Sequence, residues 1–235
     1  MKYKDRFKVL KEFVDFRPDN RLQVLDFGGR TGDLLLASNG LIREENYTNI
    51  EIIEEYCIQG KKKFPKADWI FYNKFNQTYN QEGQPRESFP TIKRKIDVIC
   101  SFNVFQYLSL NELKETLEYF KKLDPYMIIA NLYSKHSYKA LEYITKKRID
   151  KFGHCIDIFQ YKEDENVKFF YLLNNHSVLI NEYELKLSSE NAINSMISFY
   201  NINFLEKELK NQIDDKFSIK KIDGNYSHFI VWKRS

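Results

Sequence analysis

Short apolar segments alternate with amphipathic segments along the first 133 residues, and this alternation is the feature that most restricts the fold. The apolar segments have the length of buried strands, and the segments between them carry apolar residues at helical spacing. Such an alternation indicates right-handed crossovers and a parallel sheet with helices on both faces. The expected strands are 22–27, 47–53, 68–73, 95–102 and 126–132, and the expected helices are 3–16, 32–38, 54–64 and 111–123.

The pattern changes after residue 134, where apolar and polar residues alternate as is typical of antiparallel strands. We expect one domain over residues 1–235, in which residues 134–200 form an inserted α/β cap. A long surface loop is expected at 76–95. The elements expected after residue 134 are a helix at 137–149, strands at 156–161, 167–173 and 177–187, a helix at 189–213 bent around 201–203, and a final hairpin over 217–234.

Charge and cysteine usage exclude several classes of protein. Lys and Arg exceed Asp and Glu by 37 − 33 = 4, and the charges are mixed along the chain, which argues against a nucleic-acid partner. The four histidines have no metal-ligand spacing, and no apolar run is long enough for a signal peptide or a membrane span. Three cysteines cannot all pair, so we expect reduced thiols in a cytoplasmic protein without metal.

The turn after the first strand carries the strongest sign of a ligand site. It reads Leu25-Asp26-Phe27-Gly28-Gly29-Arg30-Thr31-Gly32 and leads into a helix. Ligands of open α/β sheets bind at the carboxyl ends of strands, and glycines let backbone N–H groups approach them closely. The G-x-G-x-x-G pattern of dinucleotide sites is absent. The acid two residues before the first glycine suits the ammonium group of S-adenosylmethionine.

This turn resembles the first motif of class I S-adenosylmethionine-dependent methyltransferases, approximately hh-D/E-h-G-x-G-x-G, with Arg30 in the place of the middle glycine. Two further segments are similar to later motifs of the family, NIEIIEEYCIQGKKKFPKADWIFYN at 49–73 and KIDVICSFNVFQYL at 95–108. The resemblance covers about 20–133 in matching order. It implies a Rossmann-like, mostly parallel sheet whose last strand is antiparallel, which suits the terminal hairpin.

The resemblance also implies roles for individual residues. Glu51 falls where an acid binds the ribose hydroxyls, and Asn73 falls where an acid accepts from the adenine amino group. The segment after the fourth strand would line the methionine end of the cofactor. The full set expected to bind S-adenosylmethionine is Asp26, Phe27, Gly28, Gly29, Arg30, Gly32, Glu51, Ile52, Asn73, Lys74, Phe102, Asn103 and Gln106.

Structural interpretations of these residues stay open beside the functional ones. Asp26 could cap the following helix, and Glu51 could be a solvated carboxylate at a strand end. Arg30 could point to solvent, which we favour slightly, or it could pair with an acidic substrate or with the cofactor carboxylate.

The resemblance implies an enzyme that methylates a small polar acceptor, with oxygen as the expected methylated atom and the cap as the acceptor-binding part. Sugar, natural-product or cell-surface precursor modification in bacteria would suit it. The candidate general bases are Tyr107, Tyr133 and His136. We expect a monomer or homodimer. The alternatives are a catalytically inactive cofactor-binding module or partner subunit and, less favoured, a dinucleotide oxidoreductase.

Overall fold

Strands alternate with helices in the first half of the chain, as the sequence predicts. The computed structural model describes residues 3–17, 21–72, 88–108, 110–134, 158–163, 167–172, 195–222 and 227–235. The elements of the first half are α1 (Tyr3–Lys11), β1 (Val24–Phe27), α2 (Asp33–Ala37), η1 (Glu44–Asn46), β2 (Tyr47–Glu51), α3 (Glu54–Lys63), β3 (Asp68–Phe71), β4 (Val98–Ser101), η2 (Phe105–Tyr107), α5 (Leu110–Lys122) and β5 (Met127–Ser134).

The second half contributes antiparallel strands and one further helix to the described part of the chain. Its elements are β6 (Ile158–Glu163), β7 (Val167–Leu172), β8 (Ser195–Tyr200), α8 (Ile202–Gln212), β9 (Ser218–Lys221) and β10 (His228–Lys233). The expected elements at 137–149 and 177–187 lie outside the described residues. So does most of the expected loop at 76–95, whose described residues, 88–95, form neither helix nor strand.

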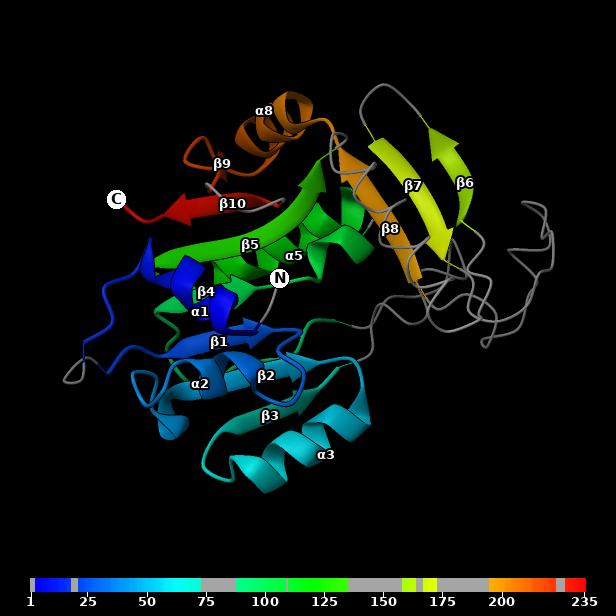
Figure 1. Cartoon of the computed structure of the whole chain (residues 1–235). Helices are drawn as coiled ribbons and strands as arrows, with labels where there is room; N and C mark the ends of the chain where they lie inside the picture. Colours follow the sequence, from blue (N-terminus) through cyan, green and yellow to red (C-terminus); the bar gives the residue numbers. More distant parts are fainter. Residues whose placement is uncertain are drawn as a thin grey trace.

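The main sheet has the order β3-β2-β1-β4-β5-β10-β9 (Figure 1). Neighbouring strands from β3 to β5 are parallel, whereas β10 is antiparallel to both β5 and β9. The predicted parallel sheet, the terminal hairpin and the antiparallel last strand are therefore confirmed. The strand order reverses at β1, since β2 and β4 lie on its two sides, and a ligand site is expected at the carboxyl edge there.

Helices cover both faces of this sheet, as Figure 1 shows. Because successive strand residues point to opposite faces, each strand contributes to two cores. One core joins Leu10 of α1 and Leu34 of α2 to Val24 of β1. The other joins Leu117 of α5 and Leu209 of α8 to the opposite face of the sheet. The arrangement with helices on both faces is thus confirmed.

The expected helix over 189–213 is wrong at 195–200, and its residues 189–194 lie outside the described part of the chain. Residues 195–200 form strand β8, which pairs antiparallel with β7 and parallel with the end of β5. Tyr200 is buried, and its hydroxyl donates to the carbonyl oxygen of Leu108 at 2.9 Å. The helix begins only after Asn201, whose side chain accepts from the Phe204 N–H. A cap and a strand partner therefore override the helical spacing read from the sequence.

The strands β6, β7 and β8 form an antiparallel extension of the sheet beyond the end of β5. Antiparallel strands near 156–161 and 167–173 were predicted, and β6 and β7 confirm them with slightly different bounds. The extension joins β5 at Tyr133 and Ser134. Treatment of 134–200 as an inserted cap remains a prediction.

Candidate functional site

The chain leaves β1 through a turn that contains three left-handed residues. The φ angles of Gly28, Arg30 and Gly32 are 77°, 53° and 83°, and α2 begins directly afterwards at Asp33. Glycine adopts this conformation freely, whereas a residue with a Cβ atom loses roughly 1–2 kcal/mol there. Arg30 is therefore a strained residue, and its φ angle explains why a glycine suits this position.

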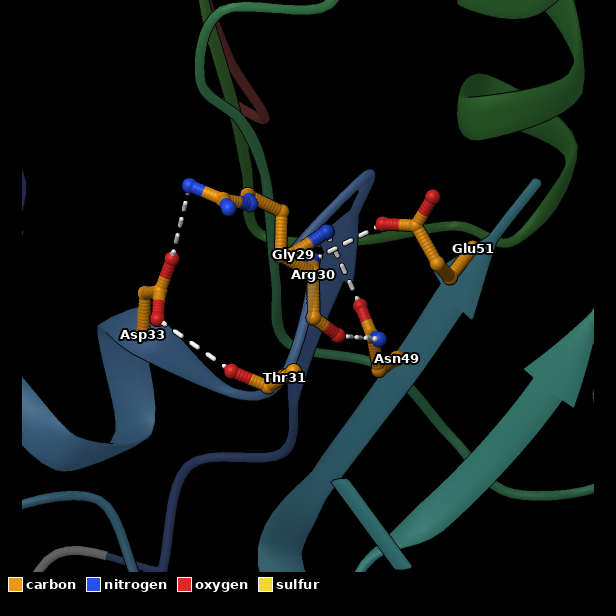
Figure 2. A network of polar contacts seen from close by, with 6 residues as sticks. All are labelled: Gly29, Arg30, Thr31, Asp33, Asn49 and Glu51. Carbon is orange, nitrogen blue, oxygen red and sulfur yellow. Dashed lines mark hydrogen bonds and ion pairs between the residues drawn. The ribbon is translucent and has the colours of Figure 1, made fainter. Parts of the chain in front are cut away.

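Two side chains of β2 hold this turn in place (Figure 2). The side-chain oxygen of Asn49 accepts from the Gly29 N–H at 3.0 Å, and its amide nitrogen donates to the Arg30 carbonyl oxygen at 2.9 Å. Glu51 accepts from the Arg30 N–H through Oε2 at 2.8 Å. The turn after β1 and the end of β2 therefore form one hydrogen-bonded unit.

Glu51 is the buried acid of this unit, with 4% of its surface exposed. Its Oε1 accepts from the backbone N–H groups of Ile52 and Ile53 at 2.9 and 3.2 Å. Burial raises the pKa of Glu51, and the hydrogen bonds from the backbone N–H groups of Arg30, Ile53 and Ile52 act against that rise. A carboxylate has about four acceptor sites, so three backbone donors leave about one for a ligand hydroxyl.

The Arg30 side chain lies at the surface, with 44% of it exposed. Its guanidinium is 3.9 Å from the carboxylate of Asp33 and 5.2 Å from the centre of the Tyr56 ring on α3. Figure 2 shows it extending toward Asp33 and away from Glu51. This placement agrees with the solvent-facing interpretation of Arg30.

Asp26 lies beneath the turn and is almost fully buried. The Tyr47 hydroxyl donates to its Oδ2 at 2.6 Å, and the Cys100 thiol lies 3.8 Å from its Oδ1. A Cβ atom on Gly29 would stand 2.4 Å from Oδ2, so the glycine is required by this carboxylate. Burial raises the pKa of Asp26 to about 6, against the hydrogen bond from Tyr47 and the charge of Arg6. Asp26 supports the turn from below, and its contact with a cofactor remains a prediction.

Replacing Asp26 with asparagine is expected to stabilise the fold at pH 7 and to reduce its pH dependence. Because the pKa is higher in the folded state, the native protein takes up a proton between about pH 6 and 4 that the unfolded chain does not. Stability therefore falls as pH rises through this window, by up to about 3 kcal/mol for a rise from 3.8 to about 6. Urea unfolding of both proteins at pH 4.5 and 7 measures this difference. Equal changes between the two pH values in both proteins would contradict it.

The segment after β4 meets the turn from the other side of the strand-order reversal. A Cβ atom on Gly28 would stand 2.2 Å from Cγ2 of Val104, so the two strand exits are in contact. Asn103 is half-buried and left-handed, with a φ of 62°. Gln106 is buried, and its Oε1 has no hydrogen-bond partner among the described residues. The exits of β1, β2 and β4 therefore bring the predicted glycines, Glu51 and Asn103 to the same edge of the sheet, and Gln106 follows in η2.

The remaining predicted residues have varied placements. Phe27 and Phe102 are buried in the two separate cores. Ile52 is half-buried and lies directly after Glu51, while Tyr133 is half-buried near the carboxyl end of β5. Tyr107 is the last residue of η2. Asn73, Lys74 and His136 lie outside the described residues.

The sequence interpretation missed two asparagines that organise this edge. Asn49 and Asn131 are fully buried within β2 and β5. Asparagine is depleted in strands, and a buried amide requires hydrogen-bond partners. An asparagine in the middle of an apolar strand was the available signal.

Solved structures with a similar fold are S-adenosylmethionine-dependent methyltransferases. One, from Clostridium acetobutylicum, is 14% identical with a TM-score of 0.51, over 96% of this chain and 94% of that chain. CalS10 from Micromonospora echinaspora, an amino pentose methyltransferase with bound S-adenosylmethionine, is 10% identical with a TM-score of 0.57, over 100% and 92%. The sugar N-methyltransferase KedS8 from a Streptoalloteichus species is 11% identical with a TM-score of 0.53, over 99% and 86%. This chain has the S-adenosylmethionine-dependent methyltransferase fold.

The resemblance drawn from the sequence motifs is confirmed at the level of this fold. No protein-family model matches the chain, and no curated protein matches it. Within the described ranges, no helix has the length and apolar character needed to cross a membrane. In the same ranges, no group of three or more His, Cys, Asp or Glu residues could hold a metal ion.

Proposed function

We propose that the chain binds S-adenosylmethionine and transfers its methyl group to a small polar acceptor. The observation that carries this proposal is the buried carboxylate of Glu51, which is hydrogen-bonded to the left-handed turn after β1. The two groups lie where the strand order reverses, which is where open α/β sheets bind their ligands. A carboxylate there with about one free acceptor site suits a ribose hydroxyl.

The other residues of the edge fit the remaining parts of this cofactor. Asn103 and Gln106 supply amide groups at the exit of β4, and the unsatisfied Oε1 of Gln106 can accept a hydrogen bond from a ligand N–H or O–H. Asn73 is proposed for the adenine amino group. The cofactor supplies an activated methyl group when bound, so the chain's own residues mainly position the acceptor.

The acceptor is proposed to lie near the carboxyl end of β5, where β8 joins the sheet. Tyr133 lies at this junction, and it is proposed as a general base together with Tyr107 and His136. Oxygen remains the proposed methylated atom. A nitrogen acceptor is a second candidate, because two structures of similar fold are an amino pentose methyltransferase and a sugar N-methyltransferase.

Isothermal titration with S-adenosylhomocysteine, with NADH as the comparison ligand, tests the proposal. Binding of S-adenosylhomocysteine but not NADH would support it, and binding of NADH alone would refute it. Transfer of a labelled methyl group to a panel of amino and hydroxy sugars then separates an enzyme from an inactive cofactor-binding module. Activity with amino sugars but not with hydroxy sugars would favour the nitrogen acceptor.

Replacing Arg30 with glycine is expected to leave the affinity for S-adenosylhomocysteine within about threefold of the wild-type value. Glycine keeps the backbone N–H that binds Glu51 and removes the left-handed strain. The lost contact with Asp33 is long, at 3.9 Å, and the guanidinium that makes it is 44% exposed, so it contributes little. Titration measures the affinity, and methyl transfer measures the turnover. Retained affinity with reduced turnover assigns the guanidinium to the acceptor, whereas a loss of affinity beyond tenfold would show that it contacts the cofactor.

A further inference from the structure

Asn131 lies where β4 leaves the sheet. The pairing of β4 with β5 ends at Ser101 and Ala130, so Asn131 is the first residue of β5 beyond that ladder. On its other side its backbone pairs with Phe229 of β10. The side chain is fully buried, so its amide must find partners within the protein.

These partners are the strand exit and the start of β10. Asn131 Oδ1 accepts from the Asn103 N–H at 2.5 Å, and Asn131 Nδ2 donates to Asn103 Oδ1 at 3.3 Å. Nδ2 also donates to Ser227 Oγ at 3.3 Å. Asn131 therefore contacts both the backbone and the side chain of Asn103.

The conformation of Asn103 explains why such a contact is needed. Its φ of 62° is unfavourable for a residue with a Cβ atom, although asparagine tolerates it better than most. Such a conformation persists where the surroundings hold it. We infer that Asn131 is a positioning residue, which holds Asn103 in its left-handed conformation and thereby presents residues 103–106 to the cofactor. The second half of this inference rests on the proposed function.

A double-mutant cycle tests the effect on the cofactor. Asn131→Ala is expected to weaken S-adenosylhomocysteine binding about tenfold in the wild-type background, since two hydrogen bonds to Asn103 are lost. In the Asn103→Gly background the same change should cost less than about threefold, because glycine adopts a positive φ without support. Equal losses in the two backgrounds would overturn the inference about cofactor binding.

Hydrogen exchange tests the positioning itself without any ligand. Asn131→Ala is expected to speed exchange of the 103–106 amides at least tenfold. Ser227→Ala is the matched control, because it removes the other partner of Asn131 and leaves both contacts with Asn103. Unchanged exchange in Asn131→Ala, or equal acceleration in both variants, would overturn the positioning role. Failure of the wild-type protein to bind S-adenosylhomocysteine would instead refute the proposed function and leave this readout valid.

Discussion

Replacing Glu51 with glutamine is expected to weaken the binding of S-adenosylhomocysteine by about 10- to 100-fold, the range for loss of a hydrogen bond to a charged group. Both carboxylate oxygens face backbone donors, since Oε2 accepts from Arg30 and Oε1 accepts from Ile52 and Ile53. In either orientation the amide of glutamine therefore directs its NH₂ group at an N–H. The substitution removes the proposed ribose acceptor and also loosens the turn.

Titration of the purified variant measures this effect, and Glu54→Gln is the matched control. Glu54 is an exposed acid at the start of α3, so its replacement removes one nearby charge without disturbing the turn. Because the pKa of Glu51 is raised, acidification should protonate it, and so weaken wild-type affinity, at a higher pH than it would for an exposed glutamate. Glu51→Gln should lack this pH dependence. Equal affinities of Glu51→Gln and the wild-type protein would remove Glu51 from the cofactor site.

The sequence was sufficient to predict the centre of the main sheet because β1, β2, β4 and most of β5 are buried on both faces. Val24 and Leu25 belong to opposite cores, so β1 is recognised as a continuous apolar run between turn residues. The ligand edge could be located from the same strands. The glycine turn directly follows β1, Glu51 is the last residue of β2, and Asn103 lies just after β4. The apolar pattern of a strand that is covered on both faces is therefore enough to locate its carboxyl end and the ligand edge there.

Features that depend on distant partners were not predictable in the same way. The segment 195–200 has the same apolar character as the helix that follows, and its pairing with β7 and the end of β5 decides that it is a strand. The pairs between Asn49 and the turn, and between Asn131 and Asn103, span 20 and 28 residues. The left-handed φ of Arg30 was likewise hidden, because a glycine signals that conformation and an arginine does not.

Gly28→Ala is expected to destabilise the fold by about 2–5 kcal/mol and to abolish binding at the turn. Two effects add: a positive φ that disfavours any Cβ atom, at about 1–2 kcal/mol, and a clash with Val104, at about 1–3 kcal/mol. The clash involves a branched side chain close to its backbone, so it cannot be relieved by moving a flexible end. It forces the exits of β1 and β4 apart at the reversal of strand order, where the cofactor is proposed to lie.

The chain offers a control that separates these two effects. Gly40 has a φ of 86°, and a Cβ atom there would have no heavy atom within 4 Å, so Gly40→Ala carries the backbone strain without the clash. Urea unfolding should therefore show a loss of about 1–2 kcal/mol for Gly40→Ala and a larger loss for Gly28→Ala. Adding Val104→Ala to Gly28→Ala should relieve the clash, recover much of the stability that the clash removed and restore part of the binding. Equal losses of stability at the two glycines would mean that the exits of β1 and β4 can separate freely. The contact between Gly28 and Val104 would then have no part in forming the site.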